Sequence, residues 1–411
     1  MTFQPVRYSQ TRAGDLRAEA ATYPFAVRKV LEFSSLVENG RFEIALPDGK
    51  VFVFGGKAPG PQARMNIHDY AFARAFAHGD IGVAESYMRG EWSTPDLTAF
   101  LELFCVNQQA IERLLAGKPF VRFAQMAWHW LHRNTRAGAR RNIHAHYDLG
   151  NSFYAKWLDP SMTYSSALGL AQDGDLAAAQ ERKYRALADA LGAHEGQHIL
   201  EIGCGWGGFA EHAARERGCR VTALTISKEQ YEFARERAHK AGLAERIDVR
   251  MQDYRDERGV YDGIASIEMF EAVGEAYWRA YFGQLRDRLK TGGRAALQII
   301  TIDEAIFPRY RRELDFIRRY IFPGGMLPTR AILEKLGANH ELPLVAQRAF
   351  GGDYALTLAQ WRDRFRAAWP DILQQGFDER FRRLWEYYLS YCEAGFRSGA
   401  IDVRHMIFAH G

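Results

Sequence analysis

Residues 201–208 read EIGCGWGG, and this stretch decides the fold. It begins inside the apolar run 198–202, which is typical of a buried strand, and helical sequence follows it. Gly203, Gly205 and Gly207 are spaced as GxGxG, which differs from the GxGxxG of dinucleotide sites, and no Walker lysine follows. Glycine permits a tight turn and lets the backbone approach a ligand where a Cβ atom would collide. The stretch therefore predicts a ligand-binding turn between a strand and a helix.

The polar residues around this turn indicate the class of ligand. Glu201 directly precedes the glycines and can pair with a cation. S-adenosylmethionine carries an ammonium and a sulfonium, so it fits this position better than a pyrophosphate. Thr225 and Gln230 follow the second strand and offer polar groups for a ribose, and Asp253 follows the third strand. Asp253 is placed to accept from an adenine amine or to cap a helix. The alternative is a tight turn that binds no ligand.

The same rhythm of strand, turn and helix continues outward from the glycine turn. Further β-rich runs lie at 220–225, 247–250, 261–267 and 294–300, and helical stretches lie between them at 228–241 and 275–290. This alternation predicts a mostly parallel sheet covered by helices on both faces. Residues 301–345 break the pattern, and we interpret them as an inserted helical lid over the site. Two further helices are expected at 356–369 and 378–397, and a last strand at 403–409.

The N-terminal part has a different character. Residues 41–55 contain two β-rich runs around Pro47-Asp48-Gly49, which is typical of a hairpin. Residues 68–78 and 96–115 have helical character. Residues 1 to about 120 therefore predict a small α+β unit, and we find no catalytic constellation in it.

The amino-acid composition limits the classes of protein to which this chain can belong. Lys and Arg total 54 against 50 for Asp and Glu, a net charge too small to argue for nucleic acid by itself. The four cysteines have neither CxxC nor zinc spacing, which predicts no metal site and free thiols in a reducing cytoplasm. The first residues lack the apolar core of a signal peptide, and no run of 18 apolar residues exists. Any membrane contact is expected to be peripheral.

One segment concentrates positive charge. Between Arg113 and Tyr147 there are seven basic residues and no acidic one, interleaved with Phe120, Phe123, Trp128 and Trp130. Cations and aromatic rings on one segment suit a surface of anionic lipid headgroups. The alternative is an interdomain helix with core aromatics and solvated bases, and the same pattern could serve nucleic acid.

Seven ordered motifs resemble those of the cyclopropane-fatty-acyl-phospholipid synthase family of S-adenosylmethionine-dependent methyltransferases. They are HYDLGNSFYAKWLDPSMTYSSA (146–167), EIGCGWGGFAEHAA (201–214), LTISKEQ (224–230), SIEMFEAVG (266–274), YIFPGGMLP (320–328), DYALTLAQW (353–361) and RFRRLWEYYLSYCEAGFR (380–397). Residues 41–98 also resemble the N-terminal lipid-facing domain of bacterial members. The resemblance implies a lipid-binding domain at 1–120, a basic aromatic linker at 121–145 and a class I methyltransferase domain with a Rossmann-like sheet at 146–411.

The resemblance also implies an activity and a set of cofactor-binding residues. The family transfers a one-carbon unit from S-adenosylmethionine to the double bond of an unsaturated acyl chain in a membrane phospholipid. Carried over by motif, Tyr164 and Ser165 touch the cofactor. Gly203 and Gly205 lie under its methionine part, Thr225 and Gln230 lie near the ribose, and Asp253 lies near the adenine.

Attack by the alkene leaves a carbocation on the acyl chain, so the pocket has to exclude water. Aromatic faces can stabilise such a cation without attacking it. Phe153, Tyr164, Phe270 and Tyr354 lie in the matching motifs and are candidates, with plain core packing as the alternative.

In the family, a bound bicarbonate is understood to take the proton that closes the ring. The Glu and Tyr of its cage match Glu271 and Tyr354, whereas its Cys is Ser166 here and its His is Gln298. Ser and Gln can still donate hydrogen bonds, so bicarbonate stays an expected ligand beside S-adenosylmethionine. Cyclopropane is then the expected product.

A further carboxylate opens an alternative. Glu268 lies three residues before Glu271, a spacing of one helical turn, and either carboxylate could be the base if its pKa were raised. Loss of a proton from another position would give a methyl-branched alkene or a methylene group in place of the ring.

Two other classes of function compete with this interpretation. One is a methyltransferase for nucleic acid or a small amine, and the other is a non-enzymatic lipid-binding protein with an altered site. The retained Glu271 and Tyr354, the glycine turn and the motifs beyond it favour the lipid enzyme. We therefore expect an unsaturated membrane phospholipid and a peripheral membrane surface as partners, without nucleic acid, and a cytoplasmic location at the inner leaflet. A homodimer stays open.

Overall fold

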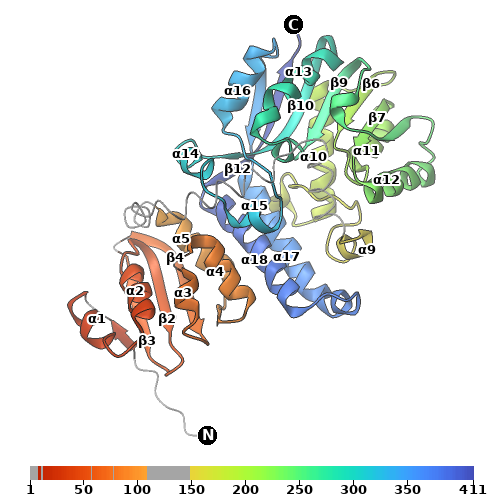
Figure 1. Ribbon diagram of the computed structural model, residues 1–411. Helices are drawn as coiled ribbons and strands as arrows, with labels where there is room; N and C mark the ends of the chain where they lie inside the picture. Colours follow the sequence, from red (N-terminus) through yellow and green to blue (C-terminus); the bar gives the residue numbers. More distant parts are fainter. Residues whose placement is uncertain (1–7, 11–12, 57, 77, 109–148) are drawn as a thin grey trace. The chain divides into compact units, whose positions relative to one another are not determined.

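The computed structural model describes residues 8–10, 13–56, 58–76, 78–108 and 149–411. These residues form two compact units (Figure 1). The first unit contains the described residues up to 108 together with Gly376–Ser398, and the second contains those from 149 to Gln375 together with Gly399–Gly411. The predicted basic aromatic linker at 121–145 lies outside the described residues.

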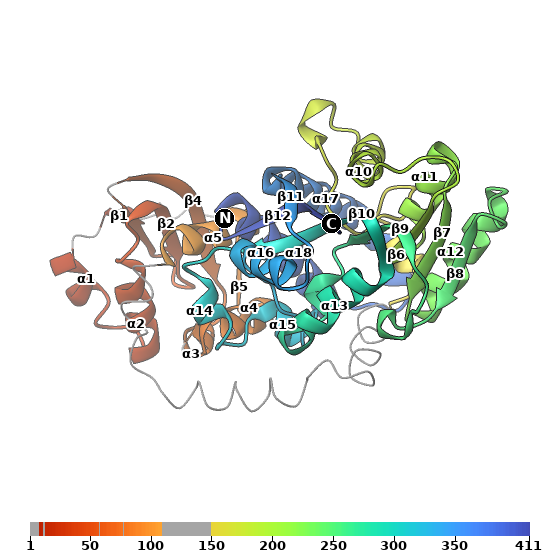
Figure 2. The ribbon, with the colours of Figure 1, turned by 90° about the horizontal axis from the view of Figure 1, so that it is seen from above.

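A seven-stranded sheet organises the second unit. Its strands are β6 (His198–Ile202), β7 (Arg220–Thr225), β8 (Ile247–Met251), β9 (Tyr261–Ile267), β10 (Leu289–Ile302), β11 (Leu344–Ala349) and β12 (Ile401–Ala409). Their order across the sheet is β11-β12-β10-β9-β6-β7-β8 (Figure 2). The strands from β10 to β8 are parallel, and β12 is antiparallel to both neighbours. The mostly parallel sheet predicted from the sequence is confirmed.

Helices cover both faces of this sheet because successive residues of each strand point to opposite sides. Ile199 of β6 packs with α10 (Leu176–Leu191), α11 (Gly208–Arg217) and α12 (Lys228–Lys240). Its neighbour Leu200 packs with α13 (Trp278–Arg288) and α16 (Arg330–Asn339). Both leucine and isoleucine are fully buried. The short elements α9 (Asn151–Tyr154), η1 (Leu170–Gln172), η2 (Tyr254–Asp256), η3 (Phe270–Ala272) and η4 (Glu275–Tyr277) lie in the connections.

The segment predicted as a lid is only partly an insertion. After β10 the chain forms two short helices, α14 (Phe307–Tyr310) and α15 (Phe316–Tyr320). From Arg330 onward it returns to the sheet, because α16 covers one face and β11 forms an edge strand. The long helix α17 (Gly351–Gln374) follows. A strand at 344–349 was not expected from the sequence, since it carries no clear alternation of apolar residues.

The first unit has its own sheet of five strands. They are β1 (Tyr8–Gln10), β2 (Asn39–Ala45), β3 (Val51–Gly55), β4 (Ala58–Ile67) and β5 (Trp92–Ser93), in the order β1-β3-β2-β4-β5. The β2–β3 pair is antiparallel, as the hairpin signal predicted. The N-terminal helices of the unit are α1 (Ala13–Glu19), α2 (Phe25–Ser34), α3 (Phe72–Phe76), α4 (Gly79–Met88) and α5 (Leu97–Val106).

A helix from the far end of the sequence completes this first unit. Helix α18 (Glu379–Arg397) packs against α4 and α5, where Thr98 Oγ1 donates to Glu393 at 2.9 Å and the rings of Tyr87 and Tyr387 lie 5.7 Å apart. The sequence-based division placed this segment with the methyltransferase part. The structure places it in the first unit, because the apolar face of α18 is buried there.

Candidate active site

The glycine turn after β6 has a backbone that favours glycine. Gly203, Gly205 and Gly207 have φ angles of +80°, +52° and +82°, in the left-handed region. The N–H groups of Gly203 and Cys204 donate to the Leu224 carbonyl at the end of β7, at 3.0 and 2.8 Å. These bonds hold the turn at the carboxyl edge of the sheet, which is where open α/β sheets bind ligands.

Glu201 is buried beside this turn, and one of its two carboxylate oxygens accepts no hydrogen bond from the described residues. Its side chain is almost fully buried, and Oε2 has no hydrogen-bond partner among the described residues. Burial raises its pKa to about 8, against a backbone hydrogen bond from Ala210 and the charges of Arg237 and Lys183. An unsatisfied buried carboxylate favours a cationic ligand, so the residues present fit the ammonium and sulfonium of S-adenosylmethionine.

The predicted ribose and adenine residues follow the next two strands. Thr225 Oγ1 donates to Gln230 Oε1 at 2.9 Å, so the two side chains form one polar group after β7. Asp253 caps η2 by accepting from the Arg255 N–H, and its carboxylate also pairs with the Arg255 guanidinium at 2.6 Å. The capping role was one of the two roles that the sequence allowed for Asp253. A role toward adenine stays a prediction.

Arg237 on α12 connects the glycine turn to the segment that precedes Tyr164. Its Nη1 donates to the Ser161 carbonyl at 2.6 Å and to the Trp206 carbonyl at 3.4 Å. Its Nε pairs with Glu211 on α11. Arg237 therefore holds together two segments to which cofactor contacts were assigned, although no sequence motif pointed to it.

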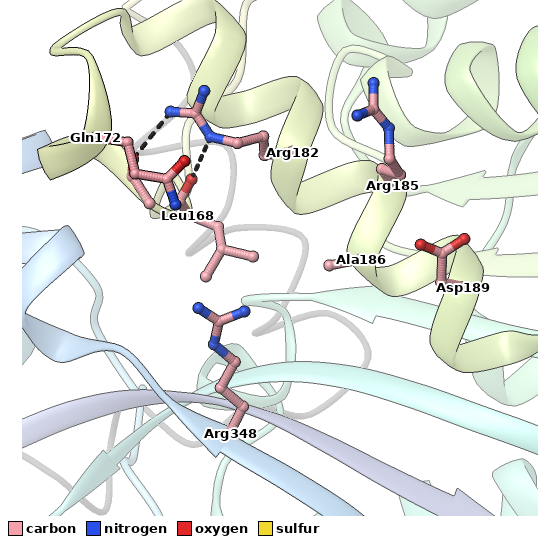
Figure 3. A pocket seen from close by; sticks show the side chains of 8 residues that line it. Leu168, Gln172, Arg182, Arg185, Ala186, Asp189 and Arg348 are labelled. Atoms are coloured by element: carbon pink, nitrogen blue, oxygen red, sulfur yellow. Dashed lines mark hydrogen bonds between the residues drawn. The ribbon is translucent and has the colours of Figure 1, made fainter.

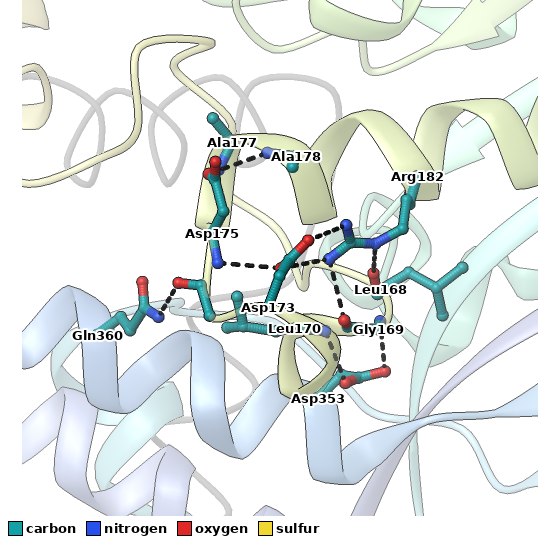
Figure 4. Close-up of polar contacts among 11 residues, drawn as sticks. Leu168, Gly169, Leu170, Asp173, Asp175, Ala177, Ala178, Arg182, Asp353 and Gln360 are labelled. Carbon is teal, nitrogen blue, oxygen red and sulfur yellow. Dashed lines mark hydrogen bonds and ion pairs between the residues drawn. The ribbon is translucent and has the colours of Figure 1, made fainter.

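The loop that carries Ser166 is held by hydrogen bonds at its C-terminal end, at residues 168–170. Asp353 accepts from the N–H groups of Gly169 and Leu170, at 2.8 and 3.1 Å (Figure 4). Arg182 of α10 donates to the Leu168 and Gly169 carbonyls and pairs with Asp173. Because Asp353 precedes Tyr354 in α17, these contacts set the spacing between Ser166 and Tyr354.

Four predicted catalytic residues meet at the carboxylate of Glu268. Its Oε1 accepts from the Ser166 N–H at 2.8 Å and from Gln298 Nε2 at 2.7 Å. Its Oε2 accepts from the Tyr354 hydroxyl at 2.6 Å. Burial raises the pKa of Glu268, while the hydrogen bonds from Tyr354, Ser166 and Gln298 and the charge of Lys183 oppose that rise.

Glu271 lies next to this group, but its carboxylate makes fewer hydrogen bonds than that of Glu268 in the described residues. Its Oε1 accepts from the Ile300 N–H at 2.5 Å, and its buried Oε2 has no partner among the described residues. Burial and the charge of Glu268 raise its pKa to about 8. The expectation that Glu268 and Glu271 share a helical turn was wrong, because Glu268 directly follows β9 with a left-handed φ of +49° and only Glu271 lies in η3.

The aromatic candidates divide between site and core. Tyr164 packs among Tyr154, Trp157 and Trp361 in tilted and edge-to-face arrangements, with ring centroids 5.3 to 5.5 Å away. Trp361 in turn lies 6.1 Å from Tyr354, so this cluster extends to the donors of Glu268. Phe270 packs against Trp278 and Tyr281 of α13, and Phe153 against Trp157 and Phe365; both phenylalanines are fully buried core residues.

Two residues of this site were missed by the sequence analysis. Lys183 of α10 is fully buried and donates from Nζ to Ser165 Oγ at 2.6 Å. Burial lowers its pKa to about 7, and the charges of Glu268, Asp159 and Glu201 oppose that shift. A lysine on the buried stripe of α10 was a signal that the sequence offered. His405 of β12, which lies 2.9 Å from Gln298 Oε1, had no such signal.

A separate surface pocket lies on the outer side of the Ser166 loop. It has a volume of about 210 Å³ and is lined by Leu168, Gly169, Gln172, Arg182, Arg185, Ala186, Asp189 and Arg348 (Figure 3). None of the predicted site residues lines it. Within the described ranges, no three His, Cys, Asp or Glu side chains gather as a metal site would require.

Comparison with known proteins identifies the relatives of this chain. The model of the mycolic acid cyclopropane synthetase family matches residues 134–406. The chain is 42% identical over 353 residues to the tuberculostearic acid methyltransferase of Mycobacterium tuberculosis, covering 84% of this chain and 82% of that protein. It is 35% identical over 363 residues to the cyclopropane-fatty-acyl-phospholipid synthase of Escherichia coli, covering 87% and 89%.

The chain belongs to the mycolic acid cyclopropane synthetase family. A solved member, a mycolic acid cyclopropane synthase in complex with SAH and CTAB, is 28% identical with a TM-score of 0.62, covering 66% of this chain and 97% of its own. The chain is thus an S-adenosylmethionine-dependent methyltransferase of class I fold that modifies lipids. The resemblance that the motifs indicated is confirmed.

Proposed function

We propose that this family member methylates the double bond of an unsaturated acyl chain in a membrane phospholipid, and that its product keeps a carbon–carbon double bond. Of the two products that the sequence left open, this is the methyl-branched or methylene alkene. The observation that carries the proposal is the position of Glu268, whose carboxylate occupies the donors that the resemblance assigns to bicarbonate.

S-adenosylmethionine, when bound, supplies an electrophilic methyl group. Glu201, Gly203 and Gly205 would hold it at the carboxyl edge of the sheet, with Tyr164 and Ser165 on the other side. The tightly packed rings around Tyr164 exclude water from a cation that forms on the acyl chain, and their faces lower its energy.

The two carboxyl groups then take different roles. Glu271, with a pKa of about 8 and one oxygen that has no partner in the described part of the chain, holds a proton at neutral pH. Burial raises the pKa of Glu268 as well, but its carboxylate accepts three hydrogen bonds, which oppose that rise and favour the charged form, so we assign it as the base. Two neighbouring carboxyl groups with different hydrogen-bonding surroundings are typical of acid–base sites.

The identity of the base bears on the product. Cyclopropane forms when the cation loses a proton from the added methyl group as the ring closes. The base removes whichever proton lies nearest to it. We infer that Glu268, which is tethered through its own side chain, takes this proton from a carbon of the acyl chain and not from the added methyl group, so that a double bond is kept. The 42% identity to a lipid methyltransferase supports the open product.

Product analysis tests this proposal. Purified enzyme is given S-adenosylmethionine and vesicles of unsaturated phospholipid, and saturated vesicles serve as the control. We expect a fatty acid that gains one carbon, keeps olefinic NMR signals or an exocyclic methylene, and yields a methyl-branched saturated chain on hydrogenation. Upfield cyclopropane protons without any olefin would contradict the open product, and no carbon gain would refute the activity.

The base is tested by Glu268→Gln. We expect turnover to fall about 10²- to 10⁴-fold, since general base catalysis contributes that much, while SAH affinity stays unchanged. Added bicarbonate should not restore turnover. Glu245→Gln, an exposed change, is the matched control and should keep wild-type turnover. Wild-type enzyme that loses activity in buffer freed of carbon dioxide, and regains it with bicarbonate, would contradict the assignment.

We also propose that the enzyme works at the inner membrane surface through its first unit. Phe25 at the start of α2 is 66% exposed, and Arg28 and Lys29 lie 5.7 and 5.5 Å from its ring centroid. An exposed ring between two cations suits anionic headgroups. In the described residues, no helix combines the length and apolar character needed to cross a bilayer.

A further inference from the structure

The side-chain amide of Gln298 is held between two strands and one loop. Gln298 and His405 are direct partners in the antiparallel β10–β12 pair, and both side chains are buried. Gln298 Nε2 lies 2.7 Å from Glu268 Oε1 and 3.3 Å from the Ser166 carbonyl oxygen. Gln298 Oε1 lies 2.9 Å from His405 Nε2.

These contacts determine which way the amide faces. A backbone carbonyl oxygen only accepts, so the Gln298 atom that faces Ser166 has to be the amino nitrogen. The other amide atom is then the oxygen, which also only accepts. His405 must therefore carry a proton on Nε2 and donate it to Gln298.

The surroundings of His405 keep its ring neutral. Phe350 packs against it edge to face, with ring centroids 4.7 Å apart. Burial, followed by the charges of Lys183 and Arg348, lowers the pKa of His405 to about 3. A neutral ring with its proton on Nε2 is a fixed donor across the physiological range.

We propose that His405 is a positioning residue that locks the Gln298 amino group onto Glu268 and so keeps Glu268 an anionic proton acceptor. The inference rests on the proposed role of Glu268 as the base. Without the donor from His405, the buried Gln298 oxygen has lost its partner, and this cost opposes the bonds from the amino group to the Ser166 carbonyl and Glu268. A turn of the amide by half a rotation then becomes accessible and brings its oxygen against the carboxylate. Repulsion between the two oxygens then favours protonated Glu268, which cannot act as a base.

Other charged and titratable groups also face this site. Lys183 of α10, Glu271 of η3 and Tyr354 of α17 act on Glu268, and Lys183 and Arg348 of β11 act on His405. All of them stay in place when His405 is replaced by another neutral side chain. A change in the pH dependence of such a variant therefore reports the orientation of the amide.

The experiment compares His405→Phe, which has no donor, with His405→Gln, whose amide can still donate. His239→Gln, an exposed change on α12, is the control. The pH dependence of kcat is measured with saturating S-adenosylmethionine and unsaturated phospholipid vesicles. In His405→Phe the acid limb should move to higher pH by about one unit, a tenfold change in the protonation constant. KM for the vesicles should not change, and His405→Gln should match the wild type.

Two results would overturn the inference. One is a His405→Phe enzyme with the acid limb of the wild type, and the other is equal loss of turnover in both variants at every pH, which would indicate a merely structural role.

A second measurement uses the wild-type protein, so it does not depend on whether a variant folds. It also distinguishes failure of this inference from failure of the proposed function. In wild-type protein with ¹⁵N-labelled histidine, NMR should find the His405 ring neutral and protonated on Nε2 between about pH 6 and 8. A proton on Nδ1, or a charged ring, would refute the locked amide. If that tautomer is present but vesicles gain no carbon, only the proposed function fails.

Discussion

At the scale of single residues, the site contains ionisable groups whose charged forms are disfavoured by burial. Glu201 and Glu271 have pKa values raised to about 8, and Lys183 has a pKa lowered to about 7. For each carboxyl the folded pKa lies above the unfolded one, so its contribution to stability is lost as pH rises from about 4.5 to 8. For Lys183 the contribution is lost as pH falls from about 10.5 to 7. Carboxyl groups with raised pKa values beside a lysine with a lowered pKa are typical of a ligand site.

Glu201 gives a prediction at this scale. At pH 7 its buried carboxyl is protonated in the free protein, and a cationic ligand beside it should lower its pKa. We therefore expect S-adenosylmethionine binding to release about one proton at pH 7, fading above pH 8 where Glu201 is already ionised. Calorimetry in buffers of different ionisation enthalpy measures this release. Glu201→Gln should abolish it, and an equal release from that variant would contradict the role.

At the scale of elements, loops from four parts of the sequence meet at one edge of the sheet. The parallel strands β6, β7 and β8 end together there, as their motifs predicted. Helix α12 adds a link between them that no motif predicted, because Arg237 joins the Ser161 and Trp206 carbonyls to Glu211. One guanidinium, with its fixed fork of donors, can satisfy three acceptors at once.

Replacement of Arg237 tests that link. In Arg237→Gln both carbonyl bonds and the ion pair are lost, so the segment before Tyr164 should loosen from the glycine turn. We expect SAH to bind about tenfold more weakly, as loss of charged hydrogen bonds implies, with little change in kcat at saturation. Titration calorimetry measures the affinity. Arg235→Gln is the matched control, since Arg235 lies exposed on the same helix and contacts only the partly buried Tyr231 in the described bonds. Equal affinities in the two variants would sink the idea.

At the scale of the whole molecule, the chain enters the first unit twice. It leaves the second unit after α17, forms α18 in the first, and returns to form β12. The two elements on either side of α18 carry Tyr354 and His405, which belong to the active site. The first unit is therefore completed by a segment inserted between two parts of the site.

The buried polar contacts of α18 should stabilise the first unit. Glu393 is fully buried, accepts from Thr98 and pairs with Arg397 at 2.6 Å. Glu393→Ala leaves the buried Thr98 hydroxyl without its acceptor, while the partly exposed Arg397 can be hydrated, so we expect a loss of about 1–2 kcal/mol in the unfolding free energy of that unit. Denaturant titration followed by tryptophan fluorescence measures it, and SAH affinity should not change. Glu379→Ala, at a largely exposed position of the same helix, should cost far less. A similar loss in both variants would contradict the prediction.

Local sequence patterns were enough to predict the sheet, the glycine turn, the family and the class of cofactor. These depend on local periodicity and on motifs whose residues lie close together, such as 201–208 with Glu201 ahead of the glycines. Three further features became visible only in the folded chain: Ser166, Gln298 and Tyr354 donate to Glu268, Lys183 and His405 join them, and α18 belongs to the first unit. The reason is that hydrogen bonds and packing act between atoms that are near in space, and these bonds join strands, loops and helices that lie between 18 and 107 positions apart in the sequence.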